Sequence, residues 1–319
     1  MKLDYEEDIK QRTSKAKTIT LGSVGLFLLT LSTSSLFGIL DWRLDALSHF
    51  RMHVLILTLV LLSLGFLFFS KILIFVSAFA LVISLVLVLP FIVNNYNTRE
   101  ITNGISISAI NVLFNNEKKE DLIMQIKNLN HDIVILSEVN NLWDEKIREH
   151  LGDYYKTIIR SEESGRDDIL LLSKLDSVYY EPFQTKGNHS GLKVNLKSGD
   201  KIITIYGIHP YSPMDEKYWT LRNRFFSDLR NDLKNNPYPT IIAGDFNSSY
   251  WSPVLKKFIN ESDLKLSFGL EGTYPSKLDR FGIDIDHIAY SKEISMENKR
   301  YFHLPGSDHR GISSIFRVY

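Results

Sequence analysis

Three long stretches without a charged residue constrain this chain more than any other feature. No Asp, Glu, Lys or Arg occurs in residues 18–40, 52–70 or 72–98. A helix needs about 20 apolar residues to cross the hydrocarbon core of a membrane. The second and third stretches meet this requirement, whereas Ser, Thr and Gly dilute the first. We therefore predict three transmembrane helices within residues 18–93, which form an N-terminal membrane anchor over residues 1–94.

The Lys and Arg residues near the ends of the stretches predict the orientation of this anchor. Five precede the first stretch, and Lys71 would lie on the same side. The other side would hold only Arg43, Arg51 and Arg99. This excess favours a cytoplasmic N-terminal segment in a multi-pass protein of the cell (inner) membrane. Three spans then place the remainder of the chain on the extracytoplasmic side, and failure of the weaker first stretch to insert would reverse that side.

The pattern of apolar residues changes after a polar joint at residues 94–103. Short apolar or alternating runs of the kind typical of β-strands occur at residues 105–110, 133–136, 169–172, 202–208, 240–243, 288–290 and 312–318. Helical periodicity occurs at residues 117–130 and 215–235. Helices interspersed with many strands, some joined without a helix, predict two packed β-sheets flanked by helices. We thus expect residues 95–319 to form a four-layer α/β sandwich.

Charge and cysteine content exclude several classes of function. Lys plus Arg and Asp plus Glu are 37 each, so the formal net charge is zero. Residues 95–319 alone hold 29 basic and 31 acidic residues. This balance argues against binding nucleic acid mainly through bulk positive charge. Because the chain has no Cys, it has no disulfide, thiolate metal site or cysteine nucleophile.

Chemically competent side chains recur beside the apolar strands, mostly directly after them. A single one of them would usually be a helix cap or a surface residue. Several strand ends that each offer a hard oxygen ligand or an imidazole instead predict a common site. The residues concerned are Asn111, Glu138, His209, Asp245, Asn247, Asp286, His287, Asp308 and His309.

This donor set favours a particular chemistry. Carboxylate and amide oxygens without thiolates suit Mg²⁺ or Mn²⁺ and not structural zinc. Such a cation accepts one or two protein carboxylates together with phosphate oxygens of a substrate, and it offsets charge on the leaving oxygen. An imidazole held by a carboxylate would orient or deprotonate the attacking water. The composition of the strand ends therefore predicts a phosphoester hydrolase.

Taken in order, these segments resemble the endonuclease/exonuclease/phosphatase superfamily over about residues 103–319. GDFN followed by Trp-Ser-Pro is similar to a membrane-anchored bacterial branch. One departure is Ser137, which stands before Glu138 where many members have Gln. The matching stretches are INVLF (110–114), LSEV (136–139), YGIHPYSP (206–213), AGDFNSSYWSP (243–253), DIDHIAYS (284–291) and GSDHRG (306–311).

The resemblance implies a metal shell and its cofactor. Glu138 would be the main carboxylate that holds the metal, and Asn111 would lie beside it in the metal shell. Asp308 would assist. The cofactor implied is Mg²⁺ or Mn²⁺.

The resemblance also implies the catalytic residues. Asp245 and Asn247 of GDFN would position the water and bind the scissile phosphate. Asp286 would orient His309, which would activate the nucleophile or contact the phosphate. His209 would stabilise the pentavalent phosphate or the leaving oxygen.

Some assignments stay open. Asp284 is the alternative partner of His309, since it precedes Asp286 by two residues and on a strand would face the same side. His287 would point to the other face and is interpreted as structural. Trp251 is expected to pack under the GDFN loop and not to stack on a base. A solvated turn is favoured over substrate contacts for Arg166, Asp167 and Asp168.

Three functions compete at this point. The first is a divalent-metal phosphodiesterase, a DNA or RNA nuclease on a membrane anchor. The second is a lipid or inositol-phosphate phosphoesterase that acts on head groups at the membrane, although no clear apolar hairpin for bilayer contact occurs in the soluble part. The third is an inert, membrane-tethered binding domain. The partners expected are thus the membrane, through residues 18–93, and a phosphodiester substrate, foremost a nucleic acid.

Overall fold

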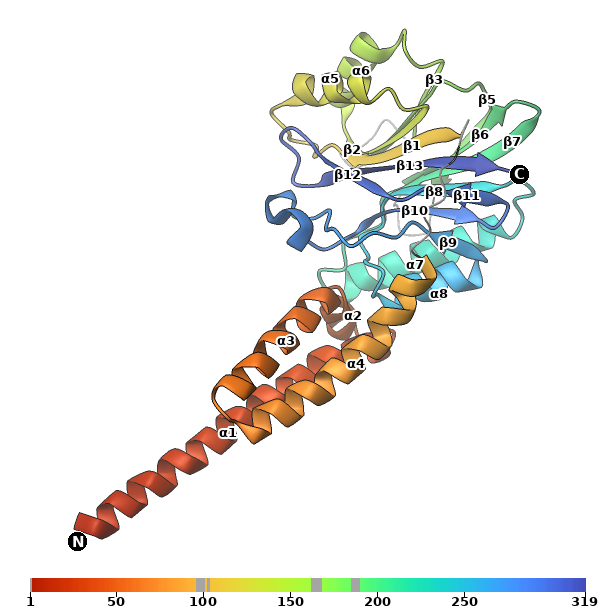
Figure 1. The fold of residues 1–319 in the computed structure, drawn as a ribbon. Coiled ribbons are helices and arrows are strands. Elements are labelled where there is room, and N and C mark those ends of the chain that lie inside the picture. Colours follow the sequence, from red (N-terminus) through yellow and green to blue (C-terminus); the bar gives the residue numbers. More distant parts are fainter. Residues whose placement is uncertain (1, 96–100, 102–103, 162–167, 185–189) are drawn as a thin grey trace. The chain divides into compact units, whose positions relative to one another are not determined.

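The computed structural model of the chain describes residues 2–95, 101, 104–161, 168–184 and 190–319. The chain divides into two compact units, Met1–Asn94 and Asn95–Tyr319, and Figure 1 labels most of their elements. Most of the polar joint expected at residues 94–103 lies outside the described residues, as do Arg166 and Asp167.

The first unit consists of helices. They are α1 (Lys2–Phe37), α2 (Trp42–Ser48), α3 (Arg51–Leu67) and α4 (Lys71–Asn95). Residues Lys15–Ser34 and Lys71–Leu89 are each long and apolar enough to cross a membrane. The middle helix α3 has only 17 residues, and it reaches the length of a span only together with α2, from which it is bent by 67°. The break at residues 49–50 therefore puts the second predicted span in question, and the structure offers two spans, or three if α2 and α3 form one.

The second unit contains two mixed β-sheets. The first has the order β11-β13-β1-β2-β4-β3, with β12 also paired to β13, and the second has the order β5-β6-β7-β8-β10-β9. The strands of the first sheet are β1 (Ile105–Asn111), β2 (Ile133–Val139), β3 (Thr157–Arg160), β4 (Asp168–Ser173), β11 (Ile294–Met296), β12 (Arg300–His303) and β13 (Arg310–Val318). Those of the second are β5 (Ser177–Gln184), β6 (Ser190–Ser198), β7 (Lys201–Ile208), β8 (Thr240–Asp245), β9 (Leu264–Leu266) and β10 (Asp286–Ser291).

Helices cover the outer faces of both sheets (Figure 1). They are α5 (Lys119–Leu129), α6 (Asn141–Leu151), α7 (Glu216–Leu233) and α8 (Pro253–Glu261), together with a short 3₁₀ segment η1 (Ser276–Phe281). Three of the four helices begin at a polar cap that accepts a backbone N–H, namely Asn140, Asp215 and Ser252. Such caps satisfy amide groups that the first helical turn leaves without a partner.

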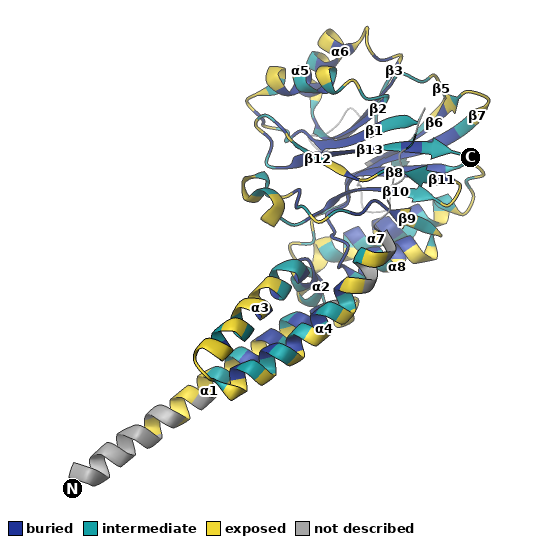
Figure 2. Ribbon diagram, in the orientation of Figure 1, coloured by how far each residue is buried: buried dark blue, intermediate teal, exposed yellow. Residues whose placement is uncertain are grey.

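The core lies between the sheets and beneath the helices. In β2, Ile133 and Ile135 join the cluster shared by the two sheets, whereas Val134 and Leu136 join the cluster under α5 and α6. Successive side chains of a strand point to opposite faces, so a strand covered on both faces has an uninterrupted apolar run. Figure 2 shows this burial along the central strands. The predicted sandwich of two sheets flanked by helices is confirmed.

The central strand pairs fix where the polar ends meet. β1 pairs in parallel with β2, and β7 pairs in parallel with β8. Each pair therefore presents its two carboxyl ends at one edge of its sheet. β10 runs antiparallel to β8, which places its first residue, Asp286, directly opposite Asp245. β13 likewise runs antiparallel to β1, so the turn that carries His309 returns to the end of β1.

One predicted turn is not solvated. Asp168 begins β4 and is buried. Its carboxylate accepts hydrogen bonds from Nε and Nη2 of Arg160 at 2.8 and 2.7 Å. The expectation of a solvated charge at this position is wrong, because the neighbouring strand β3 supplies a guanidinium that the local sequence does not reveal.

Candidate active site

Asn111 connects the two halves of a carboxylate cluster. Its Nδ2 donates to Glu138 Oε1 at 2.9 Å and to Asp245 Oδ2 at 3.3 Å. Its Oδ1 accepts the N–H of Leu113 at 3.1 Å. The amide therefore presents nitrogen, and not oxygen, to both carboxylates. In this arrangement the Asn111 amide bridges Glu138 and Asp245.

Glu138 is held at a distortion of its strand. The register of β2 against β4 shifts between Leu136 and Val139, and Glu138 has a φ of +61°. Left-handed backbone at a non-glycine residue costs about 1–2 kcal/mol. The N–H of Phe114 donates to Glu138 Oε2 at 3.2 Å, and Asn111 holds the other oxygen. The bulge thus aims the carboxylate at the cluster.

The GDFN segment brings Asp245 to the edge of the second sheet. Gly244 has a φ of +144°, and a Cβ there would lie 2.0 Å from the backbone oxygen of Ile208. Only glycine permits this approach of β8 to β7. Asp245 Oδ1 accepts the N–H of Asn247 at 2.8 Å. Asn247, with a φ of +48°, in turn donates its Nδ2 to Pro210 O at 2.9 Å.

Two imidazoles flank the other oxygen of Asp245. His209 Nε2 lies 3.6 Å and His309 Nε2 lies 3.7 Å from Asp245 Oδ2. His309 Nδ1 lies 2.9 Å from Asp286 Oδ2. Because an ionised carboxylate only accepts hydrogen bonds, the ring proton is on Nδ1. Asp286 therefore turns the Nε2 edge of His309 toward Asp245.

The charges of these groups depend strongly on one another. Burial and the adjacent charge of Asp286 raise the pKa of Asp245 to about 6, against the opposing effect of the two histidines. Burial lowers the pKa of His309, but Asp286 and Asp245 outweigh it and raise that pKa to about 10. At neutral pH, His309 is thus an imidazolium, whereas Asp245 is a carboxylate of unusually high basicity.

Asp286 and not Asp284 is the partner of His309. Asp284 instead binds Lys299 Nζ through both carboxylate oxygens, at 2.8 and 2.7 Å. It precedes β10, which begins at Asp286. His287 is fully buried, lies 2.8 Å from Ser248 O through Nε2, and packs against Tyr250. These contacts agree with the structural role expected of His287.

Asp308 lies in the turn before β13 and is half-buried. Its Oδ1 is inaccessible and has no hydrogen-bond partner among the described residues. Asp286 Oδ1 is in the same condition. Buried carboxylate oxygens without a partner suit a hard divalent cation. Asp245, Asp286 and His309 also offer ligand atoms within 4.8 Å of one another. The residues present thus fit a divalent metal at this edge.

Several neighbours of the site were not expected from the sequence. The ring of Tyr274 lies 4.9 Å from that of His309. Burial and the charges of Asp308, Asp245 and Glu138 raise the pKa of Tyr274.

Two further neighbours hold the polypeptide around the cluster. Ser307 Oγ donates to Asn111 O at 2.7 Å and accepts the N–H of His309 at 3.1 Å. It thereby ties the end of β1 to the turn before β13. Arg222 is fully buried on α7 and donates from Nη1 to Ser248 Oγ at 2.9 Å. In the sequence, Ser307 could be found as the first residue of the Ser-Asp-His motif, whereas no motif pointed to Arg222.

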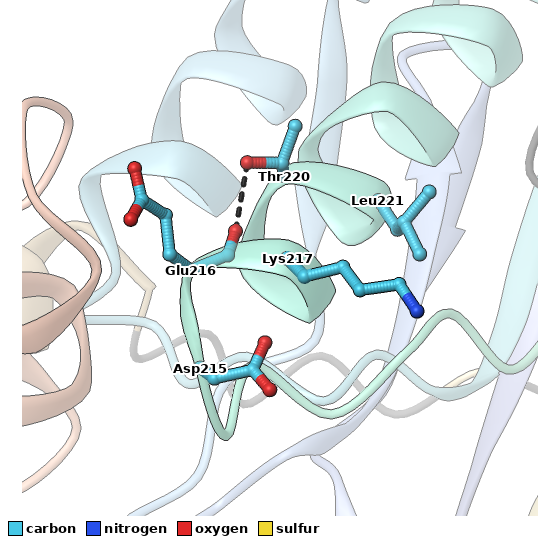
Figure 3. Close-up of a pocket in the computed structure, with 5 residues that line it drawn as sticks. All are labelled: Asp215, Glu216, Lys217, Thr220 and Leu221. Carbon is cyan, nitrogen blue, oxygen red and sulfur yellow. Dashed lines mark hydrogen bonds between the residues drawn. The ribbon is translucent and has the colours of Figure 1, made fainter.

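A hollow of about 500 Å³ opens elsewhere, at the start of α7. Figure 3 shows its lining and the hydrogen bond from Thr220 Oγ1 to Glu216 O, of 2.7 Å. It contains no member of the carboxylate and imidazole cluster. Its lining residues are Asp215, Glu216, Lys217, Thr220 and Leu221. The residues predicted for catalysis therefore converge away from this hollow.

The fold and the cluster at its strand ends define a class, the phosphoesterase α/β sandwich. The sequence profile of the Endonuclease/Exonuclease/phosphatase family matches residues 109–309. The chain belongs to this family, and the resemblance expected from the motifs is confirmed. None of the curated proteins compared with the chain has a significant sequence match to it.

Solved structures support the same fold. A humanized TDP2 of D. rerio is 15% identical, with a TM-score of 0.57 over 68% of this chain and 100% of that one. SmcL is 16% identical, with a TM-score of 0.58 over 67% of this chain and 99% of that one. An endonuclease/exonuclease/phosphatase from Bacteroides vulgatus is 14% identical, with a TM-score of 0.58 over 68% and 100% of the two chains.

Proposed function

We propose that this protein is a divalent-metal-dependent phosphodiester hydrolase on a membrane anchor, and that its substrate is nucleic acid. The observation that carries the proposal is the convergence of Glu138, Asp245 and the Asp286–His309 pair through direct contacts. Asn111 bridges the first two, and His309 Nε2 lies 3.7 Å from Asp245. Neither solvation at the surface nor packing in the core explains why these groups, which are distant in sequence, lie together.

Glu138 would be the main carboxylate that holds Mg²⁺ or Mn²⁺, with Asn111 beside it in the metal shell and Asp308 assisting. When bound, the cation offsets negative charge on the phosphoryl and leaving oxygens. This supply of positive charge is consistent with the excess of carboxylates over imidazoles in the cluster.

The protein's own groups would divide the remaining work. Asp245, whose pKa burial and Asp286 raise to about 6, would accept a hydrogen bond from the attacking water and take its proton. His309, an imidazolium fixed by Asp286, would contact a phosphate oxygen through Nε2. His209 would stabilise the oxygen that leaves as the new P–O bond forms and the old one breaks. Asn247 would hold the loop between Asp245 and the segment after His209 through Pro210.

Nucleic acid is favoured as substrate by one comparison. A structure of D. rerio TDP2, 14% identical with a TM-score of 0.57, is described as complexed with a single-strand DNA product. The near-neutral charge of residues 95–319 further predicts modest affinity that falls with salt. A lipid or inositol-phosphate head group is the second candidate. It is favoured by the short segment between the end of α4 at Asn95 and the start of β1 at Ile105. Ten residues span at most about 35 Å, which would keep the site close to a bilayer.

The membrane assignment is part of the proposal. Two helices, or three if α2 and α3 form one span, have the length and composition of membrane spans. With three spans and a cytoplasmic N-terminus, the catalytic unit would be extracytoplasmic. With two spans, both ends would lie on the same side.

A substrate panel with the full-length protein in detergent tests the proposal. Single-stranded DNA, duplex DNA, RNA, a chromogenic phosphodiester, sphingomyelin and an inositol phosphate would each be offered with Mg²⁺ or Mn²⁺. We expect cleavage of nucleic acid that EDTA abolishes. Turnover of a lipid or inositol phosphate alone would favour the second candidate.

Matched variants assign the activity to this site. His309→Ala and Glu138→Ala should each lower the rate by orders of magnitude. The controls are His303→Ala and Glu145→Ala, which alter exposed residues of the same types and should retain activity. Undiminished activity in both site variants would end the assignment.

A further inference from the structure

A buried lysine lies directly behind the Asp286–His309 pair. The side chain of Lys299, which precedes β12, is fully inaccessible. Its Nζ donates to both carboxylate oxygens of Asp284, at 2.8 and 2.7 Å, and to the backbone oxygen of Asp286 at 2.7 Å. Tyr301 OH donates to Asp284 Oδ2 at 3.0 Å. The three donor positions of the ammonium are therefore all used within the protein.

The backbone of Asp286 requires such a donor. Phe246 N–H donates to Ile285 O at 2.9 Å, and ladder bonds alternate along an antiparallel pair. The N–H and C=O of Asp286 consequently point away from β8, toward the side on which β9 runs. β9, however, pairs only with Ala289, Tyr290 and Ser291. At Asp286 the sheet lacks a strand on this side.

Two side chains take the place of the missing strand. Thr273 Oγ1 accepts the N–H of Asp286 at 3.2 Å, and Lys299 donates to its C=O. A buried backbone oxygen without a donor is destabilising. The position of the Asp286 peptide is thus set by one hydroxyl and one ammonium, and the ammonium is set by Asp284.

This solution is electrostatically expensive. Transfer of an ion pair into the interior removes the hydration of both ions, and apolar replacements are often at least as stable. An apolar side chain at position 299 could fill the space, but it would leave the Asp286 oxygen without a donor. What the lysine adds over such a residue is a fixed location for the aspartate that orients His309.

We propose that Lys299, held in place by Asp284, is a positioning residue for the Asp286–His309 pair. The inference rests on the proposed function, since it assigns to Lys299 the alignment of the same site. Lys299 does not reach the reacting atoms. Its effect passes through the Asp286 backbone to the His309 ring, where a displacement of about 1 Å can cost on the order of a hundredfold in rate.

Steady-state kinetics of the full-length protein in detergent provide the first test. Lys299→Met keeps most of the side-chain volume and removes the donor. We expect kcat to fall between tenfold and a hundredfold while KM stays within twofold, and Lys299→Arg to recover part of the loss. The matched control is Lys193→Met. Lys193 is ion-paired and mostly buried against Glu181 and Asp232, at 3.0 Å from each, and its loss should leave kcat unchanged.

A second measurement does not depend on activity. The Nδ1 proton of His309 in its hydrogen bond to Asp286 should give a low-field proton resonance that His309→Ala removes. Lys299→Met and the milder Asp284→Asn should shift or broaden this signal, whereas Lys193→Met should not. Should Lys299→Met fail to fold, Asp284→Asn and Lys299→Arg decide by the same two measurements.

The outcomes separate the two proposals. A kcat within threefold of the wild type, together with an unmoved His309 signal in the Lys299 and Asp284 variants, overturns the positioning role. A fall in thermal stability alone, with the signal unmoved, overturns that role as well, since a merely structural lysine would behave in that way. If the wild-type protein cleaves none of the substrates, the proposed function fails, and the His309 resonance still decides whether Lys299 positions the pair.

Discussion

Asn111→Asp tests the arrangement of the carboxylate cluster most directly. Asn111 is fully buried, and its Nδ2 donates to two carboxylates at 2.9 and 3.3 Å. The substitution keeps the shape of the side chain but exchanges the shared donor for an acceptor that carries negative charge. The protein without metal should be destabilised, and a divalent cation should reverse the effect.

The magnitude follows from these contacts. Each lost hydrogen bond to a charged group is worth about 1.5–3 kcal/mol. Like charges about 4 Å apart repel by about 4 kcal/mol at an effective dielectric constant of about 20. Uptake of a proton by one carboxylate limits this repulsion, so the loss should be larger at pH 8 than at pH 5.5. We expect a net loss of at least about 3 kcal/mol in EDTA at pH 8. For a domain of this size, that is a fall in Tm of about 6–12 °C.

Tryptophan fluorescence during heating provides the assay. Trp143, Trp219 and Trp251, three of the four Trp residues, belong to residues 95–319. The Tm of Asn111→Asp should rise more with Mn²⁺ than that of the wild type, because an additional carboxylate then faces the cation.

Asn116→Asp is the matched control. Asn116 is also buried, but its Nδ2 donates to the neutral backbone oxygens of Val112 and Pro305, at 3.1 and 2.8 Å. Its variant should lose stability and gain no additional response to Mn²⁺. If the Tm of Asn111→Asp in EDTA lies within 2 °C of the wild type, or if Asn116→Asp responds equally to Mn²⁺, the amide does not face the carboxylates as described.

Three further outcomes are expected. In the folded protein the pKa of His309 is raised from 6.5 to about 10, so protonated His309 stabilises the folded state fully below pH 6.5. In EDTA this contribution is lost as the pH rises toward 10, at up to about 1.4 kcal/mol per pH unit. Urea unfolding between pH 7 and 9 should show this slope, and an identical slope in His309→Ala would contradict the assignment. Gly244→Ala should lower the free energy of unfolding by at least about 3 kcal/mol or prevent folding, because its Cβ would meet Ile208 O. Gly199 has a φ of +61° and open space around it, so Gly199→Ala should lower the free energy of unfolding by only about 1 kcal/mol. Equal free energies of unfolding for the two variants would refute the backbone argument. A reporter fused after residue 319 should respond as an extracytoplasmic protein, and a cytoplasmic signal would instead indicate two spans.

The sequence was most informative where a strand is buried on both faces. The uninterrupted apolar run before Glu138 and the one before Asp245 each predicted a strand and located its carboxyl end. Parallel pairing then explains why residues distant in sequence meet at one edge. Helix α6 and strand β6 were not predicted although their periodicity is present. Trp143, Ile147 and Leu151 follow helical spacing, and alternate residues of β6 are buried.

Other contacts had no local signal. The pairing of Asp168 with Arg160 depends on which strand lies beside β4. The choice between Asp284 and Asp286 depends on Lys299, which comes from a segment that follows β11. In the first unit, the bend between α2 and α3 cannot be seen in a count of uncharged residues. These features arise from tertiary packing, which overrides composition and spacing.

The left-handed backbone of Glu138 carries a consequence for how this protein could lose its activity. A glycine at that position would relieve about 1 kcal/mol of strain at the bulge and would delete the carboxylate. The backbone of Glu138→Gly should therefore form the same bulge as that of the wild type. This variant should lose turnover, and its free energy of unfolding should be no lower than that of Glu138→Ala. Selection for folding alone would therefore favour glycine at position 138, so we expect Glu138 to be retained only where its carboxylate is used.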